Sequence, residues 1–160
     1  MEARLVELLK QPTCLVGVGN PLRRDDGIGP WIIGAVRAAA AAGTKVRVLD
    51  AQDVPENFAP VIARDACLNV VFIDAVAAPG PAGTSVFGPL ADFVEAPSFS
   101  THKLALSLSA RFLEAAGKRI FLLGIVPGDL SFGEGFTSEV ERTAVSLRDL
   151  IKRTLAAPLS

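Results

Sequence analysis

Four short apolar runs, spaced along the chain, constrain its fold more than any other feature of the sequence. They are Cys14–Val18, Lys45–Leu49, Asn69–Ile73 and Arg119–Ile125. Most of them are apolar without alternation, which is typical of strands buried on both faces of a parallel sheet. Segments with helical character separate the runs. The sequence therefore predicts an α/β protein of three layers, in which a twisted, mostly parallel sheet lies between helices.

Helical periodicity and helix-boundary residues mark the segments between the strands. The predicted helices are 3–10, one that begins near Pro30 and ends at Gly43, 55–66, one that follows Ser100 or Thr101, and one that begins at Ser138. Asp53 is interpreted as the cap of the third helix, and Ser100 or Thr101 as the cap of the fourth. By three- and four-residue spacing, the last two helices are expected to bury Leu104, Leu108, Phe112 and Ala115, and Val140, Ala144, Leu147 and Ile151.

The rest of the chain offers weaker signals. Residues 75–100 are rich in Pro and Gly, with one short β candidate at Thr84–Phe87, and the tail 156–160 is expected to fray. No internal repeat or linker divides the sequence, so we expect residues 1–160 to form a single domain.

Composition excludes several classes of protein. Half of the 160 residues are hydrophobic, which argues against a disordered chain. Sixteen Lys and Arg against seventeen Asp and Glu leave a net charge of −1, so nucleic-acid binding is not expected. The first ten residues do not resemble a signal peptide, and no apolar stretch is long enough for a membrane span. We expect a soluble, cytoplasmic protein that does not bind membranes.

Polar residues follow three of the predicted strands, where ligands bind in open parallel sheets. Asn20, Asp25 and Asp26 follow the first strand, Asp50 the second and Asp74 the third, and the single histidine, His102, precedes a helix. Two carboxylates and an imidazole would form a three-ligand site suited to a borderline divalent metal such as zinc or nickel. Caps, turns and an exposed histidine would explain the same residues, and spacing alone does not decide between these readings.

Two other chemistries have less support. Gly17 and Gly19 begin like a dinucleotide-binding fingerprint, but Leu22 replaces the third glycine and Asp25 and Asp26 would repel a pyrophosphate. No nucleophile elbow of the Gly-x-Ser-x-Gly type is present. Cys14 and Cys67 are interpreted as apolar positions in the core, away from the crevice.

Several motifs in the same order resemble the hydrogenase maturation endopeptidases. The run Gly17-Val-Gly-Asn-Pro-Leu-Arg-Arg-Asp-Asp-Gly-Ile-Gly29 is similar to their amino-terminal signature. The likeness continues through segments 48–51, 55–57, 72–75, 100–104 and 123–127. Val126 departs from the family, several of whose members have an acidic or amide residue there. The segment 75–100 shows little similarity, and such a variable loop would suit partner selection.

The resemblance implies a function, a site and a partner. These endopeptidases remove a carboxy-terminal extension from the large-subunit precursor of nickel–iron hydrogenases. The positions that contact nickel and carry catalysis fall on Asp26, Asp74 and His102, with the nickel supplied by the precursor. Beside this implied site, we expect Asp25 to orient the loop. The implied fold has five strands, one of them antiparallel. We expect a monomer. The alternative function is a chaperone that checks the metal in the precursor without cutting it.

Overall fold

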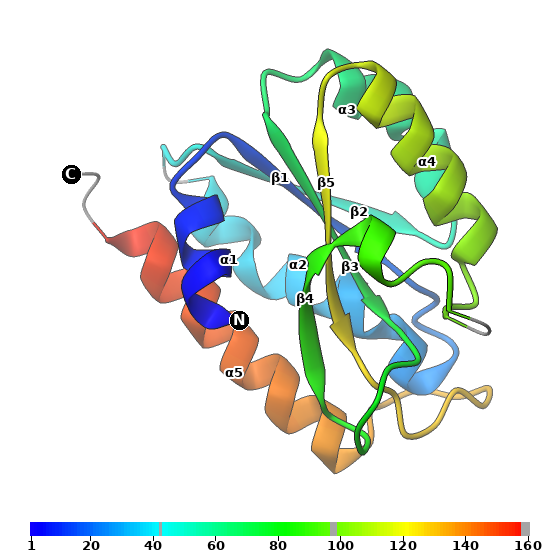
Figure 1. The fold of residues 1–160 in the computed structure, drawn as a ribbon. Helices are drawn as coiled ribbons and strands as arrows, with labels where there is room; N and C mark the ends of the chain where they lie inside the picture. The colour runs from blue at the N-terminus through cyan, green and yellow to red at the C-terminus, as the bar shows by residue number, and fades with distance from the viewer. Residues whose placement is uncertain (42, 97–98, 158–160) are drawn as a thin grey trace.

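A five-stranded sheet forms the centre of the molecule in the computed structural model, which describes residues 1–41, 43–96 and 99–157 (Figure 1). The strands are β1 (Thr13–Val18), β2 (Val46–Gln52), β3 (Asn69–Ala75), β4 (Ser85–Pro89) and β5 (Arg119–Ile125). Their order is β2-β1-β3-β5-β4, in which β4 pairs antiparallel with β5 and the other pairs are parallel. This confirms the mostly parallel sheet with one antiparallel strand.

Helices cover both faces of the sheet, as the three-layer prediction required. The first face is covered by α1 (Glu2–Leu9), α2 (Ile28–Ala40) and α5 (Ser138–Ala156), and the second by α3 (Ala59–Arg64) and α4 (Lys103–Ala115). Successive strand residues alternate between the two cores, so Leu15 and Val71 pack on the first face while Val16 and Phe72 pack on the second. Each face thus has its own hydrophobic core.

Glycine allows α2 to lie unusually close to the sheet. A Cβ at Gly29 would lie 2.6 Å from the carbonyl oxygen of Val18 and would also overlap the carbonyl of Ile73. Gly19, at φ +147, adopts a backbone conformation that other residues rarely adopt, and a Cβ there would overlap the carbonyl of Asp26. The glycines of the first motif are therefore required by close packing between the first loop, the helix and the sheet.

The helix predicted at 55–66 is interrupted. A one-turn 3-10 helix spans Pro55–Asn57, and α3 begins only at Ala59. Because Pro60 lacks an N–H, it cannot bond the carbonyl four residues earlier, and a new helix starts around it. The prediction that Asp53 caps this helix is wrong, because the residues at the two helix starts are Val54 and Phe58 and neither start has a side-chain cap.

The buried face of α4 also differs from the prediction. The helix buries Leu106, Ser109, Ala110 and Leu113. The predicted core residues Leu104, Leu108 and Phe112 are instead 73%, 50% and 51% exposed, and Ala115 is exposed as well. The segment carries two apolar stripes at helical spacing, and periodicity cannot tell which one faces the sheet. The predicted face of α5 is confirmed, because all four of its residues are buried.

The remaining boundaries agree with the sequence to within a few residues. The β candidate at Thr84–Phe87 corresponds to β4, and α5 continues to Ala156 in the predicted tail, of which residues 158–160 lie outside the described part. Strands β2 and β3 run slightly further than predicted, so Asp50 and Asp74 lie within the strands. Among the described residues, no helix combines the length and apolar character needed to cross a bilayer.

Candidate metal and active site

Three residues from separate parts of the chain meet at the carboxyl end of the parallel strands. Asp26 lies in a 3-10 turn (Arg24–Gly27) after β1, Asp74 near the end of β3, and His102 immediately before α4. One potential ligand atom from each lies within 4.8 Å of the others. In the described part of the chain this is the one group of three or more such side chains close enough to share an ion.

The fold explains why these side chains converge. Val70, Phe72 and Asp74 alternate with residues that face α2, so the Asp74 carboxylate points to the α4 side of the sheet. His102 is the residue that precedes the first turn of α4, on that same side. All three side chains are buried, with Asp74 at 0%, Asp26 at 1% and His102 at 8% exposure. Two carboxylates without Lys or Arg partners are thus held in the interior.

Hydroxyl groups beside the histidine position both carboxylates. Ser100 Oγ donates to Asp74 Oδ2 at 2.6 Å, and Thr101 Oγ1 donates to Asp26 Oδ1 at 3.1 Å. The N–H of Asn20 donates to Asp26 Oδ2 at 2.9 Å. The interpretation of Ser100 or Thr101 as a helix cap is therefore wrong, because α4 has no side-chain cap and both hydroxyls bind site carboxylates. In the sequence, the one signal that these two hydroxyls belong to the site is their position directly before the single histidine.

The contacts of His102 indicate which ring nitrogen carries a proton. Nδ1 lies 3.2 Å from Thr101 Oγ1 and 3.4 Å from Asp74 Oδ2, whereas Nε2 lies 3.9 Å from Asp26 Oδ2. Because the Thr101 hydroxyl donates its proton to Asp26, its oxygen accepts from His102, which assigns a proton to Nδ1. In the neutral ring, Nε2, the nitrogen nearer to Asp26, then keeps its lone pair.

Burial and charge shift the pKa values of the site in the same direction. Burial raises the pKa of Asp74, and hydrogen bonds from His102 and Ser100 offset only part of this effect. Burial lowers the pKa of His102, but the hydrogen bond to Asp74 and the charges of Asp74 and Asp26 outweigh it, so that the pKa is raised. The apo site thus favours holding a proton between Asp74 and His102.

The donor set fits a borderline divalent cation. Asp74 Oδ1 is buried and has no hydrogen-bond partner among the described residues, which is costly for an isolated carboxylate oxygen. Ligand bonds of about 2.0–2.2 Å allow donor atoms of one ion to lie up to about 4 Å apart. The three donor atoms lie within 4.8 Å of one another, which is close to this range. A bound cation would also compensate the buried negative charge.

Asp25 does not face this cluster but holds the loop beside it. Its carboxylate accepts hydrogen bonds from the N–H groups of Gly128, Asp129 and Thr137 and from the Thr137 hydroxyl, at 2.8 to 3.0 Å. The side chain is fully buried. These contacts connect the first loop to the segment between β5 and α5, which agrees with the loop-orienting role expected of Asp25.

Other sequence candidates lie outside the cluster. Asp50 Oδ1 accepts from the N–H of Gln52 at 3.0 Å, which is a turn contact. Cys14 and Cys67 are buried free thiols in the core between the sheet and α3–α4. Burial raises the pKa of Cys14 to about 12, so its thiol is a poor nucleophile.

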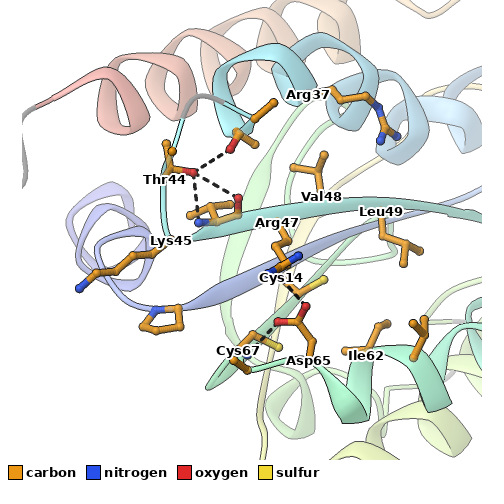
Figure 2. A pocket seen from close by; sticks show the side chains of 17 residues that line it. Cys14, Arg37, Thr44, Lys45, Arg47, Val48, Leu49, Ile62, Asp65 and Cys67 are labelled. Atoms are coloured by element: carbon orange, nitrogen blue, oxygen red, sulfur yellow. Dashed lines mark hydrogen bonds and ion pairs between the residues drawn. The ribbon is translucent and has the colours of Figure 1, made fainter.

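A groove that the structure does describe is also separate from the three residues. It is a groove of about 730 Å³ beside the free edge of β2, between α2 and α3, and Arg37, Lys45 and Arg47 extend around it (Figure 2). None of the glycine-loop residues 17–30 lines it. At the loop itself, the Asn20 N–H is bound to the Asp26 carboxylate, in the position where a phosphate would need a free donor. Both observations argue against the dinucleotide alternative.

Comparison with solved structures identifies proteins of the same fold. The NiFe hydrogenase maturation protease HycI from Thermococcus kodakarensis KOD1 is 26% identical, with a TM-score of 0.83 over 96% of this chain and 99% of that one. The endopeptidase HycI from Escherichia coli is 25% identical, with a TM-score of 0.75 over 88% and 89%. The hydrogenase maturating endopeptidase HybD from E. coli has a TM-score of 0.74 over 87% and 88%, but its 23% identity supports the fold alone.

The wider comparisons with family models and with curated proteins find no match. The layered fold is thus the one that these solved maturation proteases have. The sequence motifs and the fold are therefore both similar to those of hydrogenase maturation proteases over most of the chain.

Proposed function

We propose that this protein is an endopeptidase that removes the carboxy-terminal extension of a hydrogenase large-subunit precursor that already carries nickel. The observation that carries the proposal is the buried cluster of Asp26, Asp74 and His102, placed at the sheet edge in the fold of known maturation endopeptidases. The cluster contains a carboxylate oxygen, Asp74 Oδ1, that has no hydrogen-bond partner among the described residues and could bind an incoming cation.

In this proposal the three residues bind the nickel of the precursor and thereby fix the scissile bond beside them. The metal would supply Lewis-acid polarisation and a more acidic water. Asp26 and Asp74 would provide oxygen ligands, and His102 would provide Nε2 while its Nδ1–H donates to the Thr101 oxygen. The hydroxyls of Ser100 and Thr101 both donate to carboxylates, so they serve to orient ligands.

Metal-based recognition explains how premature cleavage is avoided. Without nickel in the precursor, the cluster has no cation to bind, and the substrate is not positioned. We therefore expect no resident metal to be needed, and we expect the protein to act as a monomer on a cytoplasmic precursor.

Incubation of the purified protein with nickel-loaded precursor tests the proposal. Mass spectrometry should show loss of a mass equal to the carboxy-terminal peptide, and precursor without nickel should stay intact. Replacement of His102 by Ala should abolish cleavage with an unchanged circular dichroism spectrum, whereas Asp92→Asn, at an exposed position, should cleave normally. Nickel-dependent binding without any mass loss would instead support the metal-checking chaperone. Cleavage by His102→Ala at the wild-type rate would exclude the role of the histidine.

A further inference from the structure

The outer face of α4 carries an apolar stripe that the fold leaves uncovered. Leu104, Leu108 and Phe112 follow one another at four-residue steps and are 73%, 50% and 51% exposed. Eight residues of helix place them along a line of about 12 Å. The opposite face of α4 already packs on the sheet, and α4 lies on the outside of the molecule, away from α1, α2 and α5 (Figure 1).

Exposed apolar side chains are common singly, but an aligned group on one helix is typical of a surface that binds another protein. Leucine and phenylalanine at successive turns are the usual anchors where a helix contacts an apolar groove or patch. The stripe is not part of the buried core cluster, to which α4 contributes Leu106, Ala110 and Leu113. Its side chains are therefore free to contact a partner.

The position of the stripe relates it to the candidate active site. Leu104 is two residues after His102, so the stripe starts where the site ends. Leu22 and Phe132, which are 50% and 80% exposed, lie on the two segments joined by the Arg23–Gly133 bridge. The N–H of Gly133 donates to the carbonyl of Leu22 at 2.8 Å, and the loop of Leu22 leads directly into Asp26. Exposed apolar side chains thus lie close in sequence or structure to both Asp26 and His102.

We propose that the stripe Leu104, Leu108 and Phe112 is a docking surface for the folded body of the protein whose peptide is cleaved. This inference rests on the proposed function and assigns the partner an apolar patch next to its metal centre. A second copy of this chain is the less favoured occupant, because stable interfaces bury about 800 Å² per partner and three side chains on one helix supply only part of that area. As an addition to metal recognition at the site, the stripe suffices for a transient complex.

The double substitution Leu104→Ser, Phe112→Ser tests the docking surface with the nickel-loaded large-subunit precursor as the probe. Because neither side chain belongs to the buried core cluster, the variant should keep a melting temperature close to that of the wild type. We expect KM for the precursor to rise at least tenfold while kcat changes less than twofold, since only binding is affected. Leu68→Ser is the matched control, because Leu68 is 51% exposed but lies before β3, at the opposite end of the strand from Asp74. It should leave KM unchanged.

Direct binding separates this inference from the proposed function. If the wild-type protein binds the precursor without cutting it, the endopeptidase proposal fails. The docking surface is then tested by the Kd for the precursor, which should rise at least tenfold in the double variant, as expected for KM. A KM or Kd equal to that of the wild type in the double variant overturns the docking surface. So does sedimentation that shows a wild-type dimer dispersed by the double substitution, because the occupant would then be a second copy.

Discussion

The carboxylate of Asp25 binds both the N–H and the hydroxyl of Thr137, at 2.9 and 2.8 Å, although 112 residues separate the two in the sequence. Two further N–H groups of the same segment share this carboxylate. One buried acid therefore joins the loop that carries Asp26 to the loop that precedes α5. The two adjacent aspartates therefore have different roles: Asp25 binds backbone N–H groups of the segment before α5, and Asp26 faces the candidate site.

Asp25→Asn should weaken this connection strongly. The amide has one acceptor oxygen, and its NH₂ group would face N–H donors that now bind a carboxylate. We expect the free energy of unfolding to fall by about 2–4 kcal/mol, measured by urea denaturation. Asp92→Asn, at an exposed position, should change it by less than about 0.5 kcal/mol. Equal stability of the two variants would contradict the anchoring role.

Asp74→Asn should separate stability from activity. Burial raises the pKa of Asp74, so ionisation of its carboxylate destabilises the folded protein. This destabilisation is absent at pH values below the ordinary pKa of an aspartate, and it grows as the pH rises through the pKa of the folded state. An amide removes that cost while it removes a metal ligand. We expect cleavage to be lost and the melting temperature at pH 7 to be unchanged or higher, where about 1 kcal/mol corresponds to about 2–4 °C. A clear fall in melting temperature with retained cleavage would refute this reading.

Cys14 should make the protein less stable in alkali. Burial raises its pKa to about 12 from 9.0, so the unfolded chain loses the thiol proton first as the pH rises. The free energy of unfolding should therefore fall above pH 9, by up to about 1.4 kcal/mol per pH unit, until the thiol of the folded protein also ionises. Unfolding in urea at pH 8 and pH 10 measures it. Cys14→Ala should show a shallower dependence, and identical slopes would contradict the prediction.

Gly29→Ala should disrupt the contact between α2 and the sheet. The added methyl group would overlap backbone atoms of Val18 and Ile73, which cannot move aside as a flexible side chain would. We expect a loss of about 1–3 kcal/mol or more in the free energy of unfolding. Gly34→Ala is the matched control in the same helix, because nothing lies within 4 Å of its added Cβ. It should stabilise the protein by about 0.5–1 kcal/mol. Similar changes in both variants would rule out the steric argument.

Several features of the fold were predictable because they depend on local patterns. The apolar runs mark four of the strands, and the face of α5 follows from Val140, Ala144 and their periodic partners, because only one apolar stripe is present there. The face of α4 was predicted wrongly, because that helix has two such stripes. The difference arises from the contact with the sheet, which selects Leu106 and Leu113 over Leu104 and Phe112.

The candidate site shows the same division. The amino-acid order supplied two acids and one histidine at the ends of predicted elements, and the geometry of a parallel sheet made their convergence plausible without deciding it. The family resemblance selected Asp26, Asp74 and His102, and the structure brings these three together. Only the tertiary structure decided that Ser100 and Thr101 bind the carboxylates, that Asp50 stays outside and that Asp25 holds a distant loop. Patterns along the chain report which residues are apolar and where elements begin. Hydrogen bonds between segments a hundred residues apart depend on how the layers pack, and no local pattern encodes them.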